Sequence, residues 1–108
     1  MTLPDIANRN ALFADPVALF SRATDQVSAD LNGDMAILNL QTKTYFGLAG
    51  VGAFIWRQLE FPTGLASLTQ AVVAEFEVEP AQCNLDTAEF LNNLASFGLL
   101  EMSNKSKQ

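Results

Sequence analysis

Few side chains of this sequence could carry out a chemical step. Histidine is absent and cysteine occurs once, at Cys83, so a histidine base, a Cys/His metal site and an intramolecular disulfide are excluded. Acidic pairs such as Glu75 and Glu79 are expected on the solvated face of a helix. Cys83 falls on the apolar stripe of a predicted helix, where a lone cysteine is usually a small buried hydrophobic residue. We therefore expect no enzyme activity, no metal and no cofactor.

Three glycines, Gly47, Gly50 and Gly52, lie between a predicted strand and a predicted helix and invite a phosphate-loop interpretation. Their spacing fits neither a Walker loop nor a dinucleotide-binding fingerprint. The next basic residue is Arg57. We interpret the glycines as a tight strand-to-helix turn with close packing.

The composition predicts one acidic domain. The 108 residues are 49% hydrophobic, with 6 Lys and Arg against 12 Asp and Glu, a net charge of −6. Such a charge repels phosphate backbones, so we expect no nucleic acid or membrane partner. The N-terminal residues do not resemble a signal peptide, and the longest uncharged run, residues 44–56, is too short to cross a bilayer. A cytoplasmic location is expected.

The first half of the chain has the alternation of strands. Residues 26–31, 36–40 and 44–48 predict an antiparallel meander of three strands, and Asn32-Gly33 predicts a two-residue turn because both types tolerate positive φ. Phe46 and Leu48 are placed on one face of the third strand.

The second half has the period of helices. The expected elements are helices over residues 50–59, 67–76 and 80–97, then a short closing strand over 99–102. Ser67 and Gln70 suggest a capping box, Pro80 opens the third helix, and Gly98 ends it. The fold class is therefore α+β, a three-stranded antiparallel sheet followed by three helices, compatible with a winged helix-turn-helix. Neither of the last two helices contains Lys or Arg, which argues against DNA recognition.

The chain divides into an N-terminal arm over residues 1–24, a domain over 25–102 and a tail over 103–108. Asp15-Pro16 suggests a short helix over residues 17–20. The apolar residues of the arm favour docking onto the domain, whereas termini are often loose; both alternatives stay open.

The third strand has the properties of an open sheet edge. Residues 44–48 contain no Pro and no charge, the usual protections of an exposed edge. Such an edge suits strand addition by a peptide. The alternative is that the arm or the third helix covers it.

The ordered combination of several segments resembles the PqqD-like family. These segments are Asn32-Gly33 through Leu48, Gly52 through Leu59, Phe76 through Pro80, Phe90-Leu91, and Gly98-Leu99-Leu100. The resemblance covers residues 26–102. It implies a winged-helix-like, non-enzymatic element that captures the leader of a ribosomally made precursor peptide. The implied partners are that peptide and a modifying enzyme such as a radical enzyme, a peptidase or a cyclase.

The resemblance also implies a binding site in which the leader adds to the third strand and packs on the third helix. Carried over by position, the peptide-binding residues are Thr44, Tyr45, Phe46, Gly47, Leu48, Asp86, Phe90, Asn93 and Phe97. The choice of helix flank rests on a helical wheel. A homodimer or obligate subunit whose third strand is permanently paired is the alternative.

The sequence departs from the family pattern in two places. Many members have Asn after the strand Leu, where it caps the first helix, but Ala49 stands there and removes a cap of about 1 kcal/mol. Residues 1–24 also exceed the usual family start.

Overall fold

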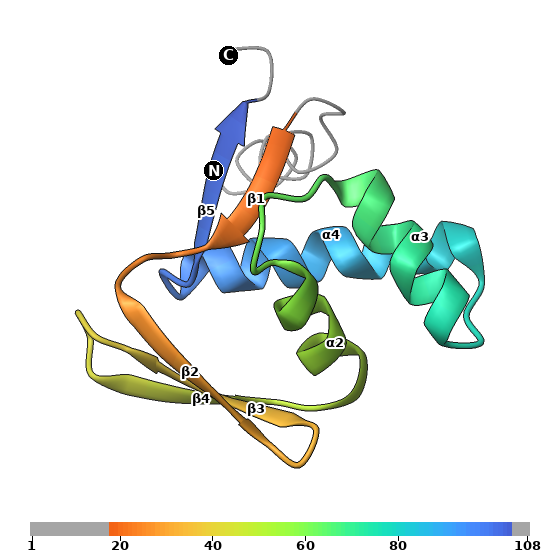
Figure 1. Cartoon of the computed structure of the whole chain (residues 1–108). Coiled ribbons are helices and arrows are strands. Elements are labelled where there is room, and N and C mark those ends of the chain that lie inside the picture. The colour runs from red at the N-terminus through yellow and green to blue at the C-terminus, as the bar shows by residue number, and fades with distance from the viewer. Residues whose placement is uncertain (1–17, 105–108) are drawn as a thin grey trace, which may run out of the picture.

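The computed structural model describes residues 18–104, which form two small antiparallel sheets and three helices (Figure 1). The elements are β1 (Ala18–Arg22), β2 (Gln26–Leu31), β3 (Asp34–Asn39), β4 (Thr44–Leu48), α2 (Gly50–Gln58), α3 (Leu65–Glu75), α4 (Pro80–Ser96) and β5 (Leu100–Asn104). One sheet has the order β2-β3-β4 and the other pairs β1 with β5. The predicted α+β fold class, with a three-stranded sheet followed by three helices, is confirmed.

Tight turns fix the register of the meander. Asn32 and Gly33 have φ angles of 57° and 100°, which confirms the two-residue turn between β2 and β3. In the resulting register Leu38 stands between Val27 on β2 and Tyr45 on β4. These three side chains therefore share the outer face of the sheet, and their neighbours in sequence share the inner face.

The core lies between the inner face of the meander, the helices and β1. Its largest fully buried side chains are Trp56, Phe20, Ile37, Leu59, Leu68, Leu91, Leu99 and Val72. Trp56 of α2 also makes two polar contacts. Its indole Nε1 donates a hydrogen bond to Ser28 Oγ at 3.1 Å, and the Arg22 guanidinium lies over its ring, 5.0 Å from the ring centroid. Ala53, Ile55 and Trp56 are thus the residues of α2 that face the core.

The helix ends follow local sequence signals at α2 and α4 and depart from them at α3. Ala49 precedes α2 and makes no side-chain cap bond, as its residue type predicts. Pro80 opens α4, whose N-cap Glu79 accepts a hydrogen bond from Gln82 N at 2.7 Å. The predicted capping box at Ser67 is wrong, because α3 begins two residues earlier, after Gly64, and Ser67 lies inside its first turn.

Residues 18–22 correct the expectation of a helix over 17–20. They form β1, which pairs with β5 so that Phe20 stands opposite Met102. Phe20 is fully buried, and its backbone N–H and C=O bond to the C=O and N–H of Thr63 at 2.8 and 2.9 Å. The closing strand runs over Leu100–Asn104 instead of 99–102. The proposed helix start at Asp15-Pro16 lies outside the described residues.

Candidate functional site

β4 forms an open edge of the meander within the described residues, as β2 does on the opposite side. β4 pairs with β3 on one side, and no described strand pairs with its other side. In an antiparallel pair, alternate residues turn their N–H and C=O groups away from the partner strand, so β4 presents unpaired backbone groups at this edge. Tyr45 is 74% exposed on the outer face, and Gly47 beside it is also exposed.

The inner side chains of β4 meet α4. Phe46 and Leu48 are half-buried and pack on the core, as their shared face predicted. The Phe46 ring lies 5.0 Å from the Phe97 ring, centroid to centroid, at an interplanar angle of 36°. At the other end of β4, a Cβ on Gly52 would come within 3.4 Å of the Phe90 ring and 3.8 Å of Leu48.

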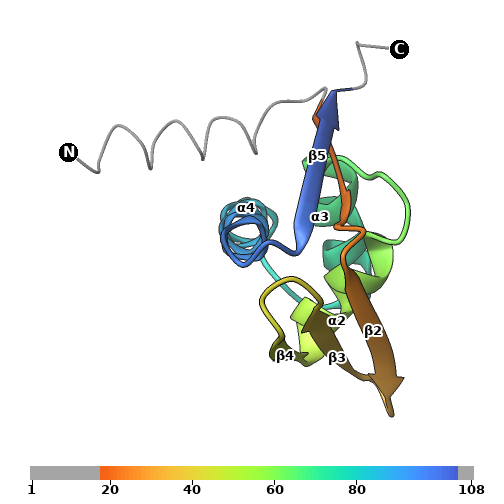
Figure 2. The same ribbon diagram turned by 90° about the vertical axis from the view of Figure 1, so that its left-hand side faces the viewer.

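These contacts show in which direction α4 runs relative to β4. Phe97 lies beside the middle of β4, whereas Phe90 lies beside the start of α2, which follows β4. The helix therefore runs antiparallel to β4, and Figure 2, which looks along α4, shows it on the β4 side of the sheet with β2 on the far side. Of the predicted helix residues, Asp86 and Asn93 are exposed on α4 and Phe97 is 50% exposed. Their role in peptide binding stays a prediction.

Asn39 is a structural residue of the site that the sequence reasoning missed. Its buried side chain accepts hydrogen bonds from Gln41 N and Thr42 N at 2.9 and 3.2 Å through Oδ1. Its Nδ2 donates to Phe97 O at 2.9 Å. Asn39 thus ties the turn before β4 to the end of α4 and fixes the distance between them. An Asn at a strand end before a polar turn is a recognisable Asx-turn signal, but its helix partner is 58 residues away.

Cys83, the single cysteine, is buried and lies 3.8 Å from Thr87 Oγ1, as expected of a small core residue. Within residues 18–104, no three acidic or cysteine side chains are grouped so that they could hold a metal ion. Over the same residues, no helix combines the length and the apolar character needed to cross a membrane.

The fold and the edge together define a winged-helix-like α+β domain with a sheet edge open to strand addition. The profile of one family, described as coenzyme PQQ synthesis protein D (PqqD), matches residues 34–100. The chain therefore belongs to the PqqD family, and the resemblance predicted from the sequence is confirmed. No curated protein matches the chain.

Two solved structures are similar to this chain. One is TbiB1 in complex with the TbiA(beta) leader peptide, with 37% sequence identity and a TM-score of 0.72, covering 75% of this chain and 94% of that chain. The other is lasso peptide synthetase B1 complexed with the leader peptide, with 23% identity and a TM-score of 0.69, covering 76% of this chain and 96% of that chain. The second likeness concerns the fold alone.

Proposed function

We propose that this chain is a non-catalytic recognition element that binds the leader of a ribosomally made precursor peptide by strand addition to β4. The observation that carries the proposal is the open β4 edge beside Phe90 and Phe97 in a member of the PqqD family. The complex of TbiB1 with a leader peptide supports it, because TbiB1 is 37% identical to this chain. The bound precursor is then presented to a modifying enzyme.

The energetics of the proposed edge favour a short peptide with apolar side chains. Each new backbone hydrogen bond contributes about 0.5–1.5 kcal/mol net. Because only alternate residues of β4 face the open edge, a five-residue strand gains few such bonds. Side chains therefore supply the rest of the affinity, and burial of one large apolar side chain contributes about 1.5–3 kcal/mol. Tyr45, Phe90 and Phe97 are the proposed apolar contacts.

The direct test is amide-shift mapping of the labelled full chain with the TbiA(beta) leader peptide as the probe. We expect saturable shifts centred on residues 43–48 and 86–97. Shifts centred on α3, or no saturable shift at millimolar peptide, contradict the proposal.

Proline substitution on the two edge strands provides a matched comparison. Val27 on β2 and Tyr45 on β4 are exposed partners of the same residue, Leu38, from opposite sides. Because Pro lacks an N–H and disfavours strand pairing, Tyr45→Pro should weaken peptide binding more than Val27→Pro. Circular dichroism of both variants separates this effect from unfolding of the sheet. Equal affinities in two folded variants would argue against strand addition at β4.

The alternative is a dimer or obligate subunit whose β4 edge is permanently paired. The lack of Pro and charge within β4 favours this reading as well, since nothing in the strand discourages pairing with a second copy. Size-exclusion chromatography with light scattering, with and without the peptide, distinguishes the two. A monomer that binds peptide supports the leader-binding role, and a stable dimer that excludes peptide supports the alternative.

A further inference from the structure

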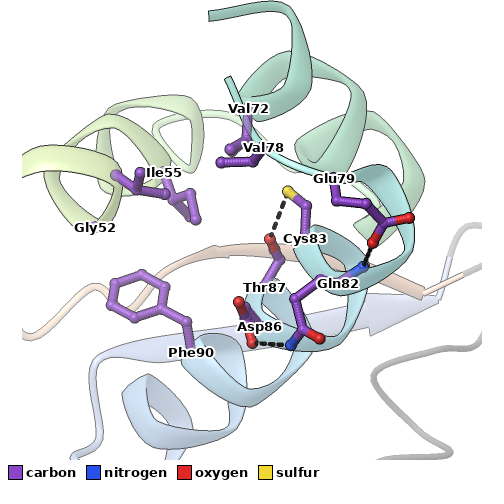
Figure 3. Close-up of a pocket in the computed structure, with 11 residues that line it drawn as sticks. Gly52, Ile55, Val72, Val78, Glu79, Gln82, Cys83, Asp86, Thr87 and Phe90 are labelled. Atoms are coloured by element: carbon purple, nitrogen blue, oxygen red, sulfur yellow. Dashed lines mark hydrogen bonds between the residues drawn. The ribbon is translucent and has the colours of Figure 1, made fainter. Parts of the chain in front are cut away.

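An apolar cavity of about 460 Å³ lies between α2, α3 and α4, beyond the end of β4. Its apolar lining includes Val51, Ile55, Val72, Val78, Cys83 and Phe90. Figure 3 shows Val72 and Val78 on one side of the cavity and Asp86 and Phe90 on the opposite side. A cavity of this size and lining accepts a large aliphatic or aromatic side chain.

The cavity continues the path that begins at the β4 edge. Phe90 contributes to both, because its ring lies beside Gly52, just past the end of β4, and also lines the cavity. At about 1.5 Å per residue, the stretch of α4 from Phe97 back to Gln82 is about 22 Å long. An extended peptide of about seven residues covers that length. A peptide paired with β4 therefore needs only two or three further residues to reach the cavity.

Two carboxylates belong to the cavity lining, and both are exposed. They are Glu79, the N-cap of α4, and Asp86, about two turns further along the helix. Gln82 donates to each of them, through its backbone N to Glu79 at 2.7 Å and through its Nε2 to Asp86 at 2.9 Å. These neutral donors leave the negative charge of both carboxylates uncompensated.

The basic side chains of residues 18–104 lie elsewhere. They are Arg22, Lys43 and Arg57. Arg22 stacks over the Trp56 ring and Arg57 pairs with Asp30 at 3.1 Å, whereas Lys43 is in the turn between β3 and β4. The ion pair of Arg57 is the one salt bridge within the described part of the chain. The mouth of the cavity therefore carries the net negative charge of Glu79 and Asp86, with no basic side chain of residues 18–104 beside it.

We propose that this cavity is the anchor site for a cationic, amphipathic segment of the bound peptide. One apolar side chain enters the cavity, and a Lys or Arg within two positions of it lies at Glu79 and Asp86. The inference rests on the proposed function, because the peptide reaches the cavity from the β4 edge. It adds a specificity rule to that function: peptides with an acidic residue beside the anchor are disfavoured by like charge.

The expected effects differ for the two parts of the anchor. Truncating the apolar residue to Ala should weaken binding about tenfold or more, because it removes most of the buried area in the cavity. Replacing the basic neighbour by Gln should weaken binding about two- to fivefold, because both carboxylates are solvent-exposed. The second effect should shrink at 0.5–1 M salt (about 3–4 Å Debye length), whereas the first should persist.

The test starts from a displayed library of random twelve-residue peptides selected on the full chain. We expect enrichment of an aliphatic or aromatic residue with Lys or Arg within two positions. One enriched synthetic peptide is then titrated against Asp86→Asn and the matched control Glu89→Gln, an exposed α4 carboxylate outside the cavity lining. Asp86→Asn should lower affinity about two- to fivefold and Glu89→Gln should leave it unchanged. Val78→Trp, which fills the cavity from a 38% exposed position, should reduce binding about tenfold with the far-UV spectrum retained.

The outcomes separate this inference from the proposed function. If selected peptides shift the amides of residues 43–48 but lack the basic neighbour and ignore Asp86→Asn and Val78→Trp, the anchor site is wrong and strand addition stands. If no selected peptide shifts those amides, the proposed function fails and the anchor site fails with it. A loss of affinity in Glu89→Gln equal to that in Asp86→Asn would show only a general charge effect and would also overturn the anchor site.

Discussion

Replacing Asn39 with Ala tests whether one buried amide holds the β4 edge against α4. The change removes two hydrogen bonds to the turn and one to Phe97 O. At about 0.5–1.5 kcal/mol each, the three bonds sum to about 1.5–4.5 kcal/mol. Because Gln41 and Thr42 are exposed and their N–H groups regain water, we expect a loss of about 2–3 kcal/mol in the free energy of unfolding. Urea unfolding followed by circular dichroism measures it.

Two further variants localise the effect. Asn39→Asp keeps the acceptor for the turn but points a carboxylate at the Phe97 carbonyl, so about 1–3 kcal/mol should be lost above the pKa of the new carboxyl. Asn93→Ala, at an exposed α4 position, should change stability by no more than about 0.5 kcal/mol. If Asn39→Ala is as stable as Asn93→Ala, the reasoning that Asn39 joins the turn to the helix is refuted.

The remaining predictions concern a glycine at the end of α4, the charge of Asp30 and the N-terminal boundary of the domain. Gly98→Ala should lower the free energy of unfolding by about 1–2 kcal/mol, because φ at this position is +74° and the new Cβ would lie 3.1 Å from Asn39 Nδ2. The control Gly47→Ala has open space around the new Cβ and should be near neutral in the same urea titration. The Gly33 N–H and the Arg57 guanidinium lower the pKa of Asp30 below 3.8. Its stabilisation is therefore present above 3.8 and lost as pH falls through the lowered value, so Asp30→Asn should flatten that part of the pH profile of unfolding; an unchanged profile contradicts this. Deleting residues 1–22 removes β1 and should abolish cooperative thermal unfolding, while deleting residues 1–17 should preserve it; the reverse result would show that β1 is dispensable.

Local sequence signals predicted the turn between β2 and β3 and both ends of α4. Asn32-Gly33 takes positive φ in the structure, Pro80 opens α4 at its first position, and Gly98 follows α4 with positive φ. Each of these features depends on a few neighbouring residues, because backbone sterics and missing donors act within one turn of chain. The family resemblance was also readable, since it consists of such local segments in order.

The tertiary structure alone decided which face of the meander is buried. Both faces carry apolar residues: Val27 and Leu31 are 55% and 58% exposed, whereas Met35 and Ile37 are buried. Alternation in the sequence predicts a strand, but which of its two faces is buried depends on the side on which the helices pack. The same holds at the site, where the contact of Phe46 with Phe97 depends on how α4 packs beside the sheet.

The pairing of β1 with β5, which are far apart along the chain, likewise could not be predicted from the sequence. Residues 1–24 read as an arm because their partner strand, β5, begins at Leu100. A short apolar segment such as residues 18–20 suits either a helical turn or a strand, and its backbone becomes a strand only when another strand supplies hydrogen bonds. The sequence by itself determined the order of elements from β2 to β5 and the composition of the open edge. Only the fold decided that α4 lies beside that edge, because the bond from Asn39 to Phe97 O joins groups that are 58 residues apart along the chain.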